Sequence, residues 1–193
     1  MRAAGATWVA AEGDPLVIYD IDSGAVVAEF EIENPVISMA ATSDGSVLFT
    51  GDAGGVVRAY DTTTWEPTAA WQAHEAFLRG LAVSPDDARL ATTGHDNLVK
   101  VWDISGLSAG ASLGAPPPLL DRIPAYIPSD AAWLSPERLG VFLATDAGYL
   151  EVSLRVDDLV TEAAQRLTRG FSIGECLTYQ IDPCPTLEEI RSR

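Results

Sequence analysis

A short apolar ending recurs three times in this chain at nearly constant spacing. It reads VIYDIDSG at 17–24, VVRAYDTTT at 56–64 and LVKVWDISG at 98–106. Tyr19, Tyr60 and Trp102 hold the same place in the three copies and lie 41 and 42 residues apart. This period is typical of repeated four-stranded units, which bury their apolar faces by stacking on one another. The repeats therefore favour a scaffold of stacked sheets over an enzyme.

Short strands are expected along most of the chain, because apolar and β-branched runs alternate with Gly, Asp, Ser and Pro. Three stretches predict tight turns fixed by Asp or Pro: TSDGS at 42–46, SPDDA at 84–88 and LSPERL at 134–139. The Gly-, Ala-, Ser- and Pro-rich stretch 106–120 predicts an insertion before an outer strand. The expected strands are 6–11, 15–20, 25–32, 36–41, 46–50, 55–60, 67–72, 78–83, 89–93, 98–103, 119–123, 130–134, 139–144 and 148–154.

The stretch HEAFLRGLAVSPDDARLATTGHDNLVKVWDISG, residues 74–106, resembles a nearly complete WD repeat. The resemblance implies an all-β fold, a WD-repeat β-propeller of about four antiparallel blades. The first and last blades are expected to be incomplete, because the strands group as 3, 4, 4 and 3. The domains predicted are 1–156 for the blades and 157–193 for a C-terminal helical tail. Two alternatives remain: a partial propeller that needs missing blades or a second copy at its open edges, and a closed four-bladed ring.

The tail changes its hydrophobic period from two to about 3.6. Leu159, Ala163, Ala164 and Leu167 predict one apolar helix face, and Ser172 with Glu175 predicts a capping box at the start of a second helix. Residues 166–186 resemble the tails that follow sensor propellers in bacterial signal-transduction NTPases of the STAND class. The matching elements are Leu167-Thr168, Glu175, Tyr179 and Cys184-Pro185, whereas Cys176 replaces a frequent tryptophan.

Proteins of the WD-repeat family carry a buried hydrogen-bond relay from Trp through Ser or Thr and His to Asp. Trp102, Thr92, His74 and Asp96 match these four types, with Thr93 as the alternative hydroxyl. An indole N–H that blade packing buries needs an acceptor, because leaving it unpaired costs about 1–3 kcal/mol. We therefore expect a structural relay in this repeat.

The other two copies depart from this pattern. Gly13 and Gly54 stand in the place of Asp96, and tyrosines replace the tryptophan. We expect those blades to be held mainly by apolar packing, with Asp14 and Asp52 as solvated turn residues.

No catalytic residue, metal site or cofactor is predicted. The relay is not interpreted as a catalytic triad, because Thr92 lies on a strand and the chain lacks a G-x-S-x-G elbow; it also lacks a phosphate-binding G-x-x-x-x-G-K-[ST] loop. The expected function is therefore a non-enzymatic interaction or sensor module that binds a protein or ligand through its loops. The candidate partner-binding residues are Glu75, Phe77, Arg79, His95 and Asn97.

The alternative function is a propeller hydrolase or lyase with a carboxylate or metal site in the central channel. Such a site would require carboxylates that converge from different blades. The repeated candidates are Asp14, Asp52, Asp96 and Asp146, although each is also typical of a turn.

The composition disfavours two classes of partner. A formal net charge of −16 repels nucleic acid and anionic lipid headgroups. No apolar run has the length of a membrane span and no signal peptide is recognised, so a cytoplasmic location is expected. Cys176 and Cys184, without histidine partners, favour neither a zinc site nor a disulfide framework.

Overall fold

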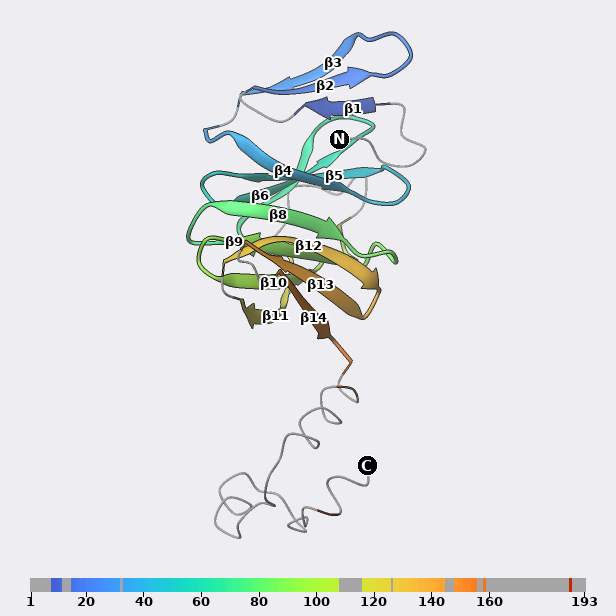
Figure 1. Ribbon diagram of the computed structural model, residues 1–193. Helices are drawn as coiled ribbons and strands as arrows, with labels where there is room; N and C mark the ends of the chain where they lie inside the picture. The colour runs from blue at the N-terminus through green and yellow to red at the C-terminus, as the bar shows by residue number, and fades with distance from the viewer. Residues whose placement is uncertain are drawn as a thin grey trace. The chain divides into compact units, whose positions relative to one another are not determined.

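The computed structural model describes residues 8–11, 15–31, 33–107, 116–125, 127–144 and 148–155, together with Asp158 and Glu188. Within these residues, 14 strands form four antiparallel sheets of 3, 4, 4 and 3 strands (Figure 1). The first sheet contains β1 (Trp8–Ala11), β2 (Leu16–Asp20) and β3 (Val26–Phe30). The second contains β4 (Val36–Ala41), β5 (Val47–Asp52), β6 (Val56–Asp61) and β7 (Pro67–Gln72). The third contains β8 (Leu78–Val83), β9 (Arg89–Gly94), β10 (Leu98–Asp103) and β11 (Leu119–Pro124), and the fourth β12 (Pro128–Ser135), β13 (Arg138–Leu143) and β14 (Tyr149–Ser153).

The predicted all-β fold and the grouping of the strands are confirmed for the described residues. In every sheet, the strands pair with their neighbours in chain order, so each sheet is a simple antiparallel meander. β11 lies after the Pro-rich insertion, and it reaches the edge of the third sheet with a register shift beside Val101 and Trp102. The insertion thus delays the outer strand without removing it.

The sheets stack face to face in chain order. β4 of the second sheet contacts β8 of the third, and β12 of the fourth contacts both β8 and β9. Figure 1 shows the first and fourth sheets at opposite ends of this stack. Because a sheet buries its apolar side chains only where another layer covers it, stacking is what stabilises each unit.

One apolar core lies between the first and second sheets. Its buried members include Leu16 and Ile18 of β2 and Leu48 of β5. Phe30 and Tyr60 make a ring contact across this interface, with centroids 4.7 Å apart.

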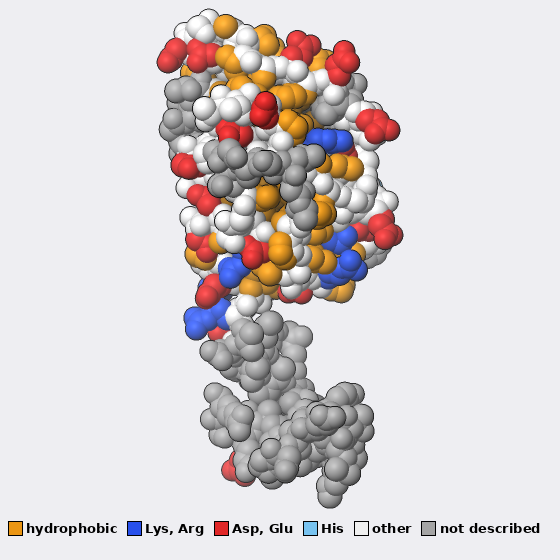
Figure 2. Space-filling model, turned by 180° about the vertical axis from the view of Figure 1, so that it is seen from behind, with side chains coloured by type: hydrophobic (Ala, Val, Ile, Leu, Met, Phe, Trp, Pro, Cys, Tyr) orange, Lys and Arg blue, Asp and Glu red, His pale blue; other side chains and the backbone are white. Residues whose placement is uncertain are grey.

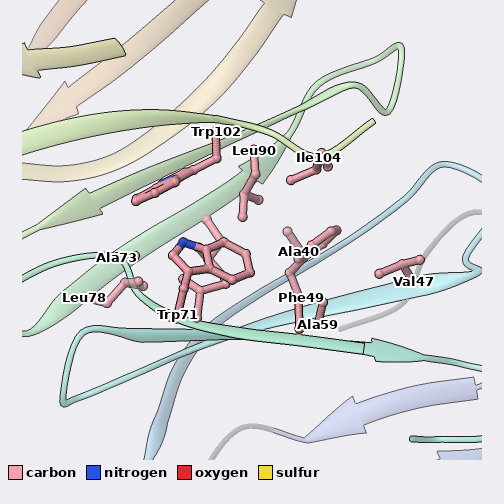
Figure 3. Close-up of a cluster of buried hydrophobic side chains, with 13 residues drawn as sticks. Ala40, Val47, Phe49, Ala59, Trp71, Ala73, Leu78, Leu90, Trp102 and Ile104 are labelled. Atoms are coloured by element: carbon pink, nitrogen blue, oxygen red, sulfur yellow. The ribbon is translucent and has the colours of Figure 1, made fainter. Parts of the chain in front are cut away.

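A second core joins the second and third sheets (Figure 3). Phe49 and Leu90 are unexposed, and Trp71 meets Trp102 edge to face with ring centroids 5.7 Å apart. The buried Trp71 Nε1 has no hydrogen-bond partner within the described residues. It points toward the Trp102 ring, whose π face is a weak acceptor for an N–H group.

Polar links fasten neighbouring sheets along the turns that the sequence singled out. The Ser43 backbone N–H and hydroxyl donate to the two Asp87 carboxylate oxygens at 2.8 and 2.5 Å, joining the β4–β5 turn to the β8–β9 turn. Arg89 donates to the Pro136 carbonyl oxygen of the β12–β13 turn. Trp133 Nε1 donates to the Ala82 carbonyl oxygen at 2.9 Å. These bonds fix the stacking register of three sheets.

The chain divides into two compact units, Met1–Val152 and Ser153–Arg193. The predicted domain boundary between residues 156 and 157 stays a prediction. The predicted helical tail lies outside the described residues except for Asp158 and Glu188, and so do Leu159, Ser172 and the cysteines. Within the part of the chain that the structure describes, no helix is long and apolar enough to cross a membrane.

Candidate functional site

Four side chains of the third sheet and its loops form one hydrogen-bonded chain. Trp102 Nε1 lies 3.1 Å from Thr92 Oγ1, which lies 2.7 Å from His74 Nε2. His74 Nδ1 lies 2.8 and 3.0 Å from the two Asp96 carboxylate oxygens. The structure therefore brings together the four residues that the sequence selected, with Thr92 rather than Thr93 as the hydroxyl.

The direction of each hydrogen bond follows from the chemistry of the donors. An indole N–H can only donate, so Thr92 Oγ1 accepts from Trp102 and its own hydrogen is left for His74 Nε2. His74 Nδ1 then carries the ring hydrogen and donates it to Asp96. The imidazole is neutral in this arrangement and satisfies a polar group at each end.

Burial favours this neutral ring. His74 and Thr92 are unexposed, and Trp102 is 7% exposed. Desolvation lowers the pKa of His74 below its usual 6.5, although the hydrogen bond and the charge of Asp96 oppose this effect. Burial alone would raise the pKa of Asp96, but the hydrogen bond from His74 and the charge of Lys100 lower it below 3.8.

Lys100 joins this group, and sequence reasoning did not select it. The side chain is 8% exposed; its Nζ donates to the Ala73 carbonyl oxygen at 2.6 Å and lies 3.7 Å from Asp96 Oδ2. In the ladder, Lys100 is the β10 residue opposite Thr92 of β9. Its signal in the sequence is a cation two residues before the aromatic residue, a place that Arg58 holds before Tyr60.

A glycine makes room for the histidine ring. A Cβ atom on Gly94 would lie 2.4 Å from His74 Nδ1 and 2.8 Å from Asp96 Oδ1. No side chain fits there while the ring is in place. The residue 42 positions earlier in the second sheet is Asp52.

The second sheet uses that equivalent position for a polar pair of its own, which corrects two expectations. Asp52 is not a solvated turn residue: it is 1% exposed and accepts from the backbone N–H groups of Gly54 and Val56, each at 2.9 Å. Its other oxygen accepts from Arg58 Nη1 at 2.5 Å. Apolar packing is therefore joined in this sheet by a buried carboxylate held by a guanidinium and its own turn.

The five candidate partner-binding residues differ in what they contact. Phe77 and His95 are exposed, their rings meet edge to face at 5.5 Å, and the His95 N–H donates to the Phe77 carbonyl oxygen at 2.9 Å. Glu75 is exposed. Arg79 lies at a register shift in β8, and its buried Nε has no partner within the described residues.

Asn97 makes hydrogen bonds to another loop of the protein. It adopts a left-handed backbone conformation with φ of 60°, which asparagine tolerates better than most residues. Its Oδ1 accepts from the Ile127 N–H at 3.1 Å, and its carbonyl oxygen accepts from the Ala125 N–H at 3.0 Å. Asn97 thus ties the β9–β10 turn to the loop that leads into the fourth sheet.

The carboxylates proposed for a catalytic channel can be followed only in part. Asp52 is bound to Arg58, and Asp96 is bound to His74 and Lys100, each within its own sheet. Asp14 and Asp146 lie outside the described residues. Within the described ranges, no three His, Cys, Asp or Glu side chains gather as a group that could hold a metal.

Replacing Thr92 with valine is expected to destabilise the protein. The substitution keeps the shape but leaves the Trp102 N–H and His74 Nε2 without partners, and each loss costs about 1–3 kcal/mol. The matched control is Thr93→Val, because the buried Thr93 Oγ1 already lacks a hydrogen-bond partner within the described residues. Urea unfolding should show a loss of at least about 2 kcal/mol for Thr92→Val and almost none for Thr93→Val. Equal losses would contradict the relay.

Stability is expected to fall as the pH drops below about 6.5. The unfolded chain protonates His74 near its usual pKa, whereas the folded chain keeps the ring neutral because its pKa is lowered. The contribution of His74 to the free energy of unfolding should therefore be fully present above pH 6.5 and decline as the pH falls below it, by at most about 1.4 kcal/mol per pH unit for one proton. Urea titrations at several pH values test this. A flat or rising profile would refute it.

Comparisons with known proteins find similarity over part of this chain. Residues 65–103 match the family model described as WD domain, G-beta repeat. The WD repeat-containing protein 91 homolog of Dictyostelium discoideum is 34% identical over 70 residues, which cover 36% of this chain and 9% of that protein. ASTRA-associated protein 1 of Pyricularia oryzae is 44% identical over 57 residues, covering 30% and 12%. WD repeat-containing protein 90 of Mus musculus is 27% identical over 99 residues, covering 51% and 5%.

The sequence match thus spans only a small part of each of these relatives. The structural match to solved proteins covers more of this chain. The structure of U3-55K matches with a TM-score of 0.63 at 20% identity, over 75% of this chain and 44% of that chain. The crystal structure of RRP9 WD40 repeats matches with a TM-score of 0.62 at 18% identity, over 76% and 46%. The repeat match, the relatives and the shared fold together support a WD-repeat propeller.

Proposed function

We propose that this chain is a non-enzymatic interaction module that binds a protein partner through two loops of its third sheet, the segment before β8 and the β9–β10 turn. The binding region is the Phe77–His95 surface, which consists of Glu75, Phe77, Arg79 and His95. The relatives, which are named as WD repeat-containing proteins, support the general role.

The exposed aromatic pair is the observation that carries the proposal. Phe77 is 39% exposed although it is a large apolar side chain, and its ring is already held against His95. A pre-ordered aromatic side chain loses little conformational entropy on binding, and such side chains dominate the affinity of many interfaces.

The surface rests on rigid elements. The His95–Phe77 backbone hydrogen bond joins the β9–β10 turn to the segment before β8. The hydrogen bond between Asp96 and His74 links the same two loops a second time. Loops held by a rigid scaffold are common recognition sites. The relay is proposed as the support of the surface and not as its binding group.

Replacing Phe77 with alanine is expected to remove partner binding without unfolding the protein. Leu120→Ala is the matched control, because Leu120 is 52% exposed but lies on β11. Proteins cross-linked to the wild-type chain in its native cells would be identified and their dissociation constants measured with each variant. At least one partner should bind Phe77→Ala about 30-fold or more weakly, as loss of a hot spot worth about 2 kcal/mol requires, and bind Leu120→Ala normally. Equal binding by the two variants would contradict the proposal.

We propose further that the module serves as the sensor part of a bacterial cytoplasmic signalling protein with an NTPase domain. The support is the resemblance of residues 166–186 to tails that follow sensor propellers in the STAND class. The genomic sequence before the codon of Met1 tests this proposal. An in-frame NTPase domain is expected there, and an independent promoter would contradict it.

A further inference from the structure

The first sheet has apolar side chains on both faces, although the face of Val17 also carries the exposed Glu29. β2 reads LVIYD, and its Leu16 and Ile18 are unexposed in the core shared with the second sheet. Because side chains alternate along a strand, Val17 and Tyr19 lie on the opposite face. The ladder places Val26, which is 53% exposed, opposite Tyr19 on that free face. Continuous apolar strands are typical of sheets covered on both sides, whereas sheets that face water alternate apolar with polar residues.

The fourth sheet is built in the same way at the other end of the stack. Leu139 and Val141 of β13 are unexposed, while Phe142 is 44% exposed. Tyr149, 47% exposed, makes a ring contact with Phe142 at 5.7 Å. A Cβ atom on Gly140 would lie 2.9 Å from Tyr149 Cε2, so the Tyr149 ring covers the glycine on this face. The free face of the fourth sheet therefore carries an exposed aromatic pair, with the Arg138–Glu151 ion pair beside it.

Internal interfaces show what the free face of the first sheet lacks. Tyr60 packs on Phe30 of the preceding sheet at 4.7 Å, and Trp102 packs on Trp71 of its preceding sheet at 5.7 Å. Tyr19 holds the same repeat position as Tyr60 and Trp102. No ring contact of Tyr19 is found within the described residues. The repeat thus predicts an aromatic neighbour for Tyr19 from a sheet before the first.

We propose that this neighbour is the Phe142–Tyr149 face of a second copy. Two copies stacked head to tail cover both free faces of each and continue the interface that already joins the internal sheets. The pair closes a ring of eight sheets, twice the four of one copy, which is within the usual range of propellers.

Charge sets the conditions for this association. Each copy has a net charge of −16, and the view in Figure 2 shows acidic side chains spread over the described surface with hydrophobic side chains exposed between them. Repulsion between copies is long-ranged and screened by salt, whereas contact between the apolar faces is not. The dimer is therefore expected to strengthen as the ionic strength rises.

The experiment is light scattering and sedimentation of the full chain and of two charged variants, one for each face. The wild type is expected at twice the chain mass of 20.5 kDa. Tyr19→Lys and Phe142→Glu should each be monomeric, and an equimolar mixture of them should regain the dimer. In the mixed dimer, one interface contains no substitution, and the other places the introduced lysine opposite the introduced glutamate. Leu120→Lys is the control for an added charge at an exposed leucine and should stay dimeric.

Each other outcome overturns the proposal. A monomeric wild type would mean that the faces are covered by residues 153–193 or by another protein. Loss of the dimer in only one variant would indicate that like faces pair, and a mass that grows with concentration would indicate an open filament. Circular dichroism of each variant shows whether it is folded, so that an unfolded protein is not counted as a monomer. If a charged variant is unfolded, Tyr19→Ser or Phe142→Ser replaces it. The dimer does not depend on the partner binding proposed above. Phe77→Ala is expected to lose the partner but to remain dimeric, so the two proposals can fail independently.

Discussion

The third sheet is covered on both faces, so every polar group inside it needs a partner from the protein itself. Thr92 and His74 are unexposed, and the Lys100 side chain is 8% exposed. An unpaired buried donor or acceptor costs about 1–3 kcal/mol, a large fraction of the stability of a domain. The hydrogen-bonded chain from Trp102 to Asp96 supplies such partners. It ends at the Asp96 carboxylate, whose side chain is 14% exposed. The same bonds fix the loops that present Phe77 and His95.

The second sheet meets the same constraint with different residues. In the second sheet, the Asp52 carboxylate at the end of β5 binds Arg58. In the third sheet, the equivalent position is Gly94, and the His74 ring fills the space beside this glycine. In both sheets a cation lies two residues before the buried aromatic residue. The repeat therefore preserves the position of the cation, whereas the carboxylate is Asp52 in the second sheet and Asp96, two positions later in the repeat, in the third. Among the described residues, the complete relay is found in the third sheet.

The strands could be predicted from the sequence because apolar runs and turn residues depend on local period, and these located the 3, 4, 4 and 3 strands. The four residues of the polar chain came from the resemblance of residues 74–106 to a WD repeat, and the structure brings them together. Features that depend on three-dimensional packing were missed. Lys100 is indistinguishable from an exposed strand residue until its Nζ is seen to reach the Ala73 carbonyl oxygen. Asp52 is indistinguishable from a solvated turn residue until Arg58 is seen to reach it. The internal role of Asn97 depends on the loop before β12, which is 30 residues away in sequence.

Nitrogen-15 NMR of the imidazole of His74 and the indole of Trp102 tests the central claim most directly. The hydrogen-bond directions require a neutral His74 ring with its hydrogen on Nδ1 at neutral pH, and a Trp102 indole N–H that exchanges with solvent only when the protein unfolds. These two signals, seen together, would establish that the buried polar chain holds the third sheet. A ring with its hydrogen on Nε2, or a charged ring beside a rapidly exchanging indole, would show that the chain of hydrogen bonds is not formed.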